Sequence, residues 1–163
     1  MGQVYFERDA VPFQYHNDPE KTRKSQHPEH ENWSTTGDVG YVDDEGYLYL
    51  TDRKAFMIIS GGVNIYPQEA ENVLINHPAV FDVAVIGVPD PDLGEVAKAC
   101  VQLSEGYLPS DELADELISF TKDSIAAYKA PRSVDFVDDL PRTPTGKLVK
   151  GQLRKRYWPA ATV

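Results

Sequence analysis

The chain has 163 residues, of which 41% are hydrophobic and 26% charged, enough for one domain of ordinary size or two small ones. No stretch approaches the roughly 18–20 apolar residues that a membrane span needs, and no signal-peptide pattern opens the sequence. The single cysteine, Cys100, excludes an internal disulfide. These features predict a cytoplasmic protein without a transmembrane segment.

The net charge of −10 is unevenly distributed, because residues 142–163 are basic and contain no acidic residue. The acidic remainder argues against nucleic acid as a partner. The basic segment has two interpretations that the sequence leaves open. It could bind a phosphate or carboxylate ligand, or it could be a solvated helix with favourable charge at its C-terminal end.

The first third of the chain is predicted to contain little regular structure. Residues 2–6 are typical of a strand, and residues 9–34 form a polar loop with one short helix after Pro19. Because so long a loop rarely opens a free-standing domain, we expect the chain to be part of a larger protein. Residues 33–50 alternate tyrosine with aliphatic residues around a Gly-containing turn, which predicts a β-hairpin.

The rest of the chain predicts a small α+β domain with a central sheet flanked by helices. A strand at 55–59 and a glycine break at 60–62 lead to a helix that starts near Pro67. The remaining predicted elements are strands 80–88 and 96–103, a helix from Ser110 that closes before Pro131, strand 134–137, loop 140–146 and helix 148–157. A β-hairpin and loop piece of another domain is expected to precede this domain.

Four short motifs carry the residues that are suited to chemistry. They are Thr36-Gly37-Asp38, Asp52-Arg53, the segment 60–69 (SGGVNIYPQE) and the segment 141–147 (PRTPTGK). Each motif alone has a plain structural explanation. Asp38 could be a turn aspartate, the glycines could serve only the fold, and Lys147 could be a surface lysine after a glycine turn.

In this order and spacing the motifs resemble the C-terminal part of the adenylate-forming enzymes. This superfamily comprises acyl- and aryl-CoA synthetases, adenylation domains of peptide synthetases and firefly luciferase. The resemblance extends from Gly2 to about Arg156. It implies that Asp38 and Arg53 bind the ribose of ATP and of the acyl-adenylate. It also implies that Lys147 is catalytic and reaches the carboxylate and the α-phosphate during adenylation.

The resemblance also implies a path for CoA. Ser60, Gly61 and Gly62 match the loop that lines the tunnel for the pantetheine arm, where bare backbone leaves room for the thiol. Lys129 falls where some members place a basic residue near the CoA phosphates. The hinge between two catalytic poses is expected at Lys54 and Ala55. The family usually has Asp or Lys at the position of Ala55, so the role of a charged hinge side chain is open.

The implied domain organisation is incomplete. Residues 1–53 correspond to the end of a large N-terminal domain, and residues 54–163 to a complete small lid domain. The phosphate loop, the adenine-binding segment and the acyl pocket belong to the large domain, which also binds most of the Mg²⁺ that accompanies ATP. We therefore expect an N-terminal domain as the chain's partner and no activity from the chain alone.

The expected function is that of an ATP-dependent, AMP-forming acyl-CoA ligase acting on a carboxylic acid, ATP and CoA. The sequence of residues 52–69 resembles the corresponding motif of fatty-acid and aryl-acid CoA ligases more than that of peptide synthetases. A long-chain fatty acid is the favoured substrate. Two alternatives are kept. One is a non-catalytic module for nucleotide sensing or protein contact, and the other is a piece of a peptide-synthetase adenylation domain.

Overall fold

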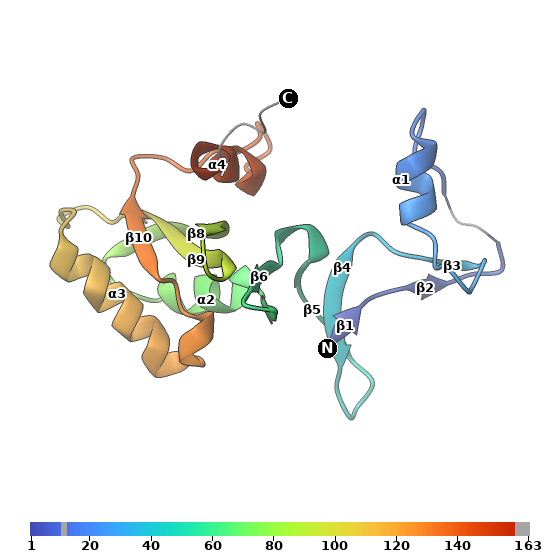
Figure 1. The fold of residues 1–163 in the computed structure, drawn as a ribbon, viewed down its shortest axis with the longest axis horizontal. Coiled ribbons are helices and arrows are strands. Elements are labelled where there is room, and N and C mark those ends of the chain that lie inside the picture. The colour runs from blue at the N-terminus through green and yellow to red at the C-terminus, as the bar shows by residue number, and fades with distance from the viewer. Residues whose placement is uncertain (11–12, 159–163) are drawn as a thin grey trace. The chain divides into compact units, whose positions relative to one another are not determined.

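The computed structural model describes residues 1–10 and 13–158 and divides into two compact units, Met1–Ala55 and Phe56–Val163 (Figure 1). Residues 11–12 of the expected N-terminal loop and 159–163 of the expected lid domain lie outside the described residues. The border expected from the sequence lies two residues before this division. The assignment of the two parts to a large domain and a lid stays a prediction. Within the described ranges, no helix is long and apolar enough to cross a bilayer.

The first unit contains two small antiparallel sheets and one short helix. Strands β1 (Gly2–Gln3), β4 (Asp38–Val42) and β5 (Leu48–Arg53) form one sheet, strands β2 (Phe6–Glu7) and β3 (Trp33–Ser34) form the other, and helix α1 spans Pro19–Lys24. The expected strand at 2–6 is thus two strands. The chain changes partner between them, because β1 pairs with β4 and β2 pairs with β3.

The hairpin expected in this unit is confirmed by the antiparallel pairing of β4 and β5. Its turn is closed by the carboxylate of Asp43, which accepts hydrogen bonds from the backbone N–H groups of Glu45 at 3.0 Å and Tyr47 at 2.8 Å. Gly46 supplies the left-handed backbone that the turn needs, with φ of 87°. The hairpin therefore brings the beginning of β4 opposite the end of β5.

The second unit is a mixed α/β domain built on a five-stranded sheet, as the sequence predicts. Its elements are β6 (Ile58–Ser60), β7 (Val63–Ile65), α2 (Pro67–Leu74), β8 (Val80–Asp90), β9 (Gly94–Leu103), α3 (Asp111–Ser124), a 3-10 turn at Ala127–Lys129, β10 (Ser133–Phe136) and α4 (Lys150–Tyr157). Strand β9 is the centre of the sheet. It pairs antiparallel with β8 and β6 and parallel with β10.

Helices cover both faces of this sheet. Because side chains alternate along a strand, Val83 and Val85 of β8 pack with α2 and α3 in one buried cluster. Ala84 and Ile86 point the other way and pack with Leu153 of α4 in a second cluster. Figure 1 shows α2 and α3 on one side of the sheet and α4 on the other. Helix α4 is therefore packed against the sheet by a buried core of its own.

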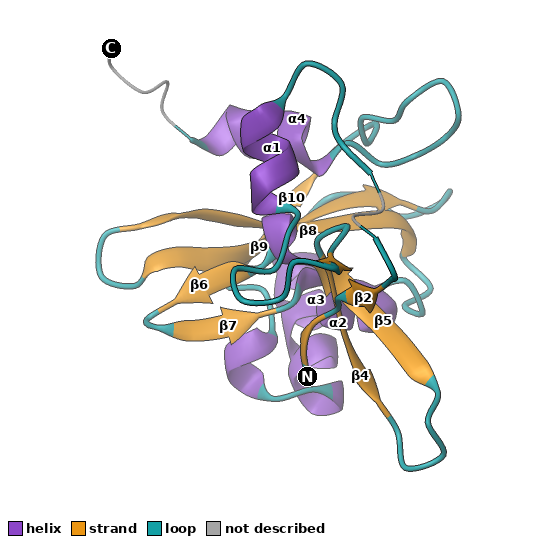
Figure 2. Cartoon of the chain, turned by 90° about the vertical axis from the view of Figure 1, so that its right-hand side faces the viewer, coloured by secondary structure: helices purple, strands orange, loops and turns teal. Residues whose placement is uncertain are grey.

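One strand of this unit was missed by the sequence analysis. The glycine pair does not lead directly into a helix. It forms the tight turn between β6 and the short strand β7, which pair antiparallel (Figure 2). Strand β7 contains only Val63, Asn64 and Ile65, too few residues to reveal an alternating pattern. The helix begins after it, at Pro67.

Two element boundaries also differ from those expected. Helix α3 ends at Ser124, because Ile125 leaves the helical region with φ of −134°, and the chain continues as a 3-10 turn before Pro131. Strand β8 continues through Asp90, which pairs with Gly94, so only residues 91–93 connect β8 to β9, whereas the expected strands leave residues 89–95 between them. The carboxylate of Asp90 caps this connection by accepting from the N–H groups of Asp92 and Leu93.

Candidate active-site residues

The hairpin of the first unit brings together the two residues assigned to nucleotide binding. Asp38 and Arg53 are register partners on β4 and β5, and the Arg53 Nε lies 3.3 Å from the Asp38 Oδ1. The Thr36 hydroxyl donates to the other carboxylate oxygen at 2.5 Å. About half of the Arg53 side chain is exposed. A carboxylate held from two sides beside an accessible guanidinium can accept from vicinal hydroxyls and donate to a neighbouring oxygen.

The two residues assigned to the hinge lie at the end of the first unit. Lys54 is fixed there by two hydrogen bonds, from its backbone N–H to the Gly37 carbonyl at 2.9 Å and from its ammonium to the Gln3 side chain at 3.0 Å. Ala55 is exposed and is the last residue of the unit. A small, exposed side chain is compatible with backbone rotation at this point, and the hinge role stays a prediction.

The glycine turn between β6 and β7 presents bare backbone. Both Gly61 (φ of 55°) and Gly62 (φ of 83°) adopt left-handed conformations that other residues avoid. The Gly61 N–H donates to the Leu93 carbonyl at 2.9 Å, and a Cβ at Gly61 would lie only 3.0 Å from the Leu93 side chain. No atom lies within 4 Å of the corresponding position at Gly62. The turn is thus pinned at Gly61 and open at Gly62.

A cavity of about 760 Å³ lies beside this turn within the second unit. Ser60 and Gly61 line one side of it, and the opposite side includes Lys122 of α3 with Tyr128 and Arg132 around Pro131. Sequence reasoning missed the latter three residues as site residues. The signal was present in the Tyr-Lys-Ala-Pro-Arg segment, which carries a basic residue on each side of the proline.

Lys129, the basic residue that the sequence analysis selected in this segment, is engaged elsewhere. Its ammonium forms an ion pair with the Glu69 carboxylate at 2.6 Å, and Lys129 does not belong to the residues that line the cavity. The hydrogen bond that the ammonium donates to Glu69 raises the Lys129 pKa, so the ammonium stays charged but is already neutralised by its partner. Arg132 is exposed and offers a second cation at the same corner.

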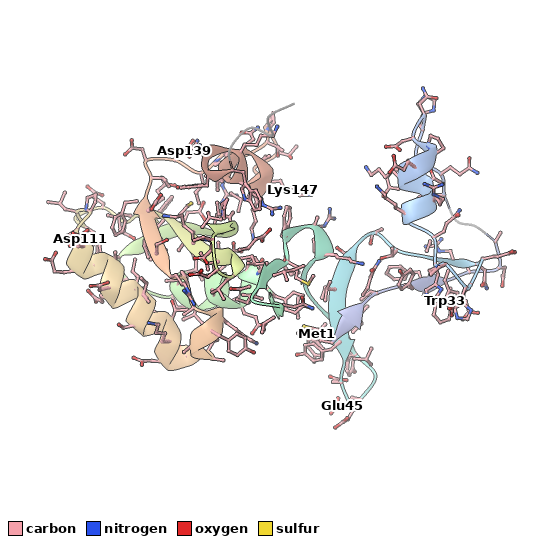
Figure 3. The ribbon with its side chains drawn as sticks, viewed as in Figure 1. Met1, Trp33, Glu45, Asp111, Asp139 and Lys147 are labelled. Carbon is pink, nitrogen blue, oxygen red and sulfur yellow. The ribbon has the colours of Figure 1, made fainter. Side chains whose placement is uncertain are left out.

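Lys147 lies on a small hairpin that precedes α4 in the chain, and Figure 3 labels its position. An antiparallel bridge joins Arg142 to Leu148 and closes the hairpin. Inside it, the Thr143 N–H donates to the Lys147 carbonyl at 2.8 Å, and the Lys147 N–H donates to the Thr143 hydroxyl at 3.1 Å. Gly146 makes the turn with φ of 82°. The Lys147 side chain is exposed, and no described residue forms an ion pair with it.

Helix α4, which follows this hairpin, is fastened to the domain by buried and half-buried polar contacts. Lys150 pairs with Glu71 of α2 at 2.7 Å, and Arg154 pairs with Glu95 of β9 at 2.6 Å. At the other end of the helix, the Tyr157 hydroxyl donates to the Asp135 carboxylate at 2.6 Å. Two of the four cations of the helix, Lys150 and Arg154, are therefore paired within the fold, whereas Lys155 and Arg156 are exposed.

Burial and hydrogen bonding together shift the pKa values of the groups around the end of α4. For the Asp135 carboxyl, burial is the largest single influence and by itself would raise the pKa. Hydrogen bonds from Lys98 and Tyr157 outweigh it, so the Asp135 pKa is lowered. Burial, together with the bond to Asp135, raises the pKa of Tyr157, and burial also raises the pKa of Cys100. A buried thiol with a raised pKa is a poor nucleophile.

Comparison with known proteins places these residues in a family. Residues 69–147 match the model of the AMP-binding enzyme C-terminal domain. The chain is 43% identical over 162 residues to the long-chain-fatty-acid–CoA ligase FadD13 of Mycobacterium tuberculosis (strain ATCC 25618 / H37Rv), an alignment that covers 99% of the chain and 30% of the relative. It is 49% identical over 127 residues to a feruloyl-CoA synthase of Amycolatopsis sp, covering 78% of the chain and 25% of the relative.

Among solved structures, the ATP-bound RpMatB-BxBclM chimera B1 matches with a TM-score of 0.79 and 42% identity, over 86% of the chain and 28% of its own length. The chain thus spans less than a third of the relatives it matches. The family model includes Lys129 and ends at Lys147, and it begins after the glycine turn.

Proposed function

Because the chain belongs to the adenylate-forming enzymes, matching their C-terminal domain, we propose that it is the lid-bearing part of an ATP-dependent, AMP-forming acyl-CoA ligase. The overall reaction is carboxylic acid, ATP and CoA to acyl-CoA, AMP and pyrophosphate. The observation that carries the proposal is Lys147. It is an exposed, unpaired ammonium among the described residues, at the tip of a hairpin that the Arg142–Leu148 bridge closes and that leads into the anchored start of α4.

The first half-reaction forms the acyl-adenylate. A carboxylate oxygen attacks the α-phosphorus of ATP, the bond from that phosphorus to the pyrophosphate oxygen breaks, and pyrophosphate leaves. Lys147 would lie beside both the attacking carboxylate and the α-phosphate and offset their negative charge. Asp38 would accept hydrogen bonds from the ribose hydroxyls, and Arg53 would donate to the same sugar. The described residues contain no cluster of three or more His, Cys, Asp or Glu suited to a metal ion. The Mg²⁺ that accompanies ATP is expected in the large domain.

The second half-reaction transfers the acyl group to CoA. The thiol sulfur attacks the acyl carbonyl, the bond to the AMP oxygen breaks, and AMP leaves. The exposed backbone at Gly61 and Gly62 and the neighbouring Ser60 are suited to the narrow pantetheine arm, because no side chain of the turn obstructs it. Arg132 lines the cavity and would bind a CoA phosphate. Lys129 remains a second candidate, weakened by its ion pair with Glu69.

The first unit supports the proposal of a larger protein. Its hairpin exposes large apolar side chains, with Val42 62%, Tyr47 63% and Leu50 59% exposed. A patch of this kind on a short hairpin is typical of a surface that other parts of a protein cover. We assign the covering part to the large N-terminal domain, in agreement with the limited share of the relatives that the chain spans. The chain alone would then release no AMP from ATP and an acid.

The proposal names the substrate only as a carboxylic acid. The name of the relative FadD13 supports a long-chain fatty acid, and the name of the feruloyl-CoA synthase supports an aryl acid. No described residue of the lid is placed to distinguish the two, because the acyl pocket is expected in the other domain. A carboxylic acid activated for transfer to a thiol is the class we propose.

The experiment that tests the function uses the full-length protein that carries this chain. Acid-dependent pyrophosphate–ATP exchange is measured with a long-chain fatty acid and with an aryl acid, followed by thioester formation on addition of CoA. We expect exchange and a thioester with at least one of the two acids. If neither acid supports exchange, and ATP binds without turnover, the non-catalytic module is the better explanation.

A further inference from the structure

The hairpin that carries Lys147 is closed at its base by Leu148, which packs against the core, and its tip is tied to the body of the second unit by Arg142. The Arg142 guanidinium donates through its NH1 group to the Gly146 carbonyl at 2.6 Å. Through its NH2 group it forms an ion pair with the Asp82 carboxylate on β8. One planar group thus joins the hairpin tip to a strand of the central sheet.

Each partner in this clasp is held in place by a second contact. The Asp82 carboxylate also accepts from the Val83 N–H at 2.9 Å, which fixes its direction at the start of β8. Gly146 lies within the hairpin, where its own N–H donates to the Thr143 carbonyl at 2.8 Å. The clasp therefore connects two parts that are already ordered and sets the distance between them.

The hairpin tip has few other constraints. Gly146 has no side chain, its neighbours Thr145 and Lys147 are exposed, and a Cβ at Gly146 would meet no atom within 4 Å. Backbone bonds within the hairpin preserve its shape but do not tie it to the sheet. An exposed loop of this kind would otherwise sample many orientations.

We propose that Arg142 is a positioning residue for Lys147, and that the clasp Asp82–Arg142–Gly146 aims the Lys147 ammonium during adenylation. This proposal rests on the proposed function. The Gly146 carbonyl belongs to the peptide bond that enters Lys147, so the guanidinium restrains the backbone from which the ammonium projects. Asp82 neutralises the charge of Arg142, which leaves the ammonium of Lys147 as the positive charge available at the tip.

Arginine is suited to this task because its fork reaches two acceptors at once, whereas a lysine ammonium is a single point. Arg142→Lys can keep the ion pair with Asp82 but loses the planar connection to the Gly146 carbonyl. The pair with Asp82 is partly exposed, so its loss should leave the fold intact. A role in positioning can therefore be separated from a role in stability.

The first measurement is hydrogen exchange on the chain itself. In Arg142→Gln we expect the amides of Gly146 and Lys147 to exchange about tenfold faster, the factor for losing a hydrogen bond to a charged group. Amides of β8 and β9 should exchange as before, which shows that the domain remains folded. Asp82→Asn breaks the same clasp from the other side and should have a similar effect. Lys155→Gln removes one exposed charge from α4 and serves as the control.

The second measurement separates the half-reactions in the full-length protein. Arg142→Gln should lower kcat for pyrophosphate–ATP exchange about tenfold with little change in KM for ATP, and Arg142→Lys should fall between it and the unmodified protein. Thioester formation from supplied acyl-adenylate should stay within about twofold. Equal loss of both half-reactions, or faster exchange at Lys147 without loss of adenylation, would overturn the positioning role. If the unmodified protein forms no adenylate at all, the proposed function fails and this role fails with it.

Discussion

Lys150 and Glu71 form a buried ion pair that joins the start of α4 to α2, with 2.7 Å between the ammonium and the carboxylate. The side chains are only 9% and 7% exposed. The same Glu71 oxygen accepts from the Val85 N–H at 2.6 Å, so the pair also satisfies an amide of β8. Helices α2 and α4 and strand β8 are thus joined through Glu71 and Lys150, and Lys150 follows Lys147 by three residues.

The first prediction concerns the stability of this pair. Lys150→Ala would leave the Glu71 charge buried without its cation, and we expect the free energy of unfolding to fall by about 3–5 kcal/mol. Urea denaturation of the chain measures this change. Lys155→Ala on the exposed side of α4 is the matched control and should change stability by less than about 0.5 kcal/mol. A similar small effect for both variants would show that water replaces the lost partner.

The second prediction concerns acid stability and Asp135. Its pKa in the folded chain is lowered below the usual value of 3.8, because the hydrogen bonds from Lys98 and Tyr157 outweigh the effect of burial. The stabilisation is therefore complete above the unfolded pKa and is lost as pH falls through the folded one. Asp135→Asn should remove this contribution. Thermal melts between neutral pH and about pH 3 should show a flatter acid dependence for the variant than for the unmodified chain.

Tyr157→Phe provides the control for that prediction. It removes one of the two donors to Asp135 but keeps the carboxylate and Lys98. Its acid dependence should lie between those of the unmodified chain and Asp135→Asn. If all three melt in parallel as pH falls, other carboxylates control acid unfolding.

The third prediction separates the open position in the glycine turn from the fold. In the full-length protein, Gly62→Trp should block thioester formation while acyl-adenylate still forms, because only the route of CoA is obstructed. Gly62→Ala is the matched control. Both side chains meet the same backbone cost at φ of 83°, but alanine adds little bulk. Comparable loss of the thioester step in both variants would mean that the glycine serves only the turn.

The sequence predicts the parts of this fold that depend on local pattern. The β-hairpin follows from alternating side chains around a glycine turn. The pairing of Asp38 with Arg53 does not follow from that pattern, because it lies beyond a shift of register between Val39 and Gly40. Strand β9 follows from the same alternation, whereas β8 is predicted from a mostly apolar run. The family resemblance, also based on local motifs, is confirmed by the match to the C-terminal domain model.

What the sequence did not predict depends on contacts between distant residues. Lys129 was assigned to CoA, but whether its ammonium faces the cavity depends on Glu69, sixty residues away in the chain. The clasp between Arg142 and Asp82 spans the same separation. No periodicity or motif reports such a pairing, because it arises only when α2 and β8 are packed beside the segments that follow β9. Strand β7 was missed for a different reason, its length of three residues.

The last prediction concerns Lys147. In the full-length protein, Lys147→Ala should lower acyl-adenylate formation by on the order of 10²-fold, the scale for removing one positioned charge stabiliser. Thioester formation from supplied acyl-adenylate should continue, because the lid is expected to turn Lys147 away from the site in that pose. Pyrophosphate–ATP exchange and the thioester assay measure the two steps separately.

The fold should be unaffected by this change, and that makes the outcome decisive. The Lys147 side chain is exposed, and the bonds that shape the hairpin use its backbone N–H and carbonyl, which alanine retains. A thermal melt of the variant should therefore match that of the unmodified protein. If the melts agree but the rates of both half-reactions fall equally, Lys147 acts in both poses. The assignment of Lys147 to adenylation alone is then wrong. If adenylation alone falls, the charge at the hairpin tip belongs to the first step.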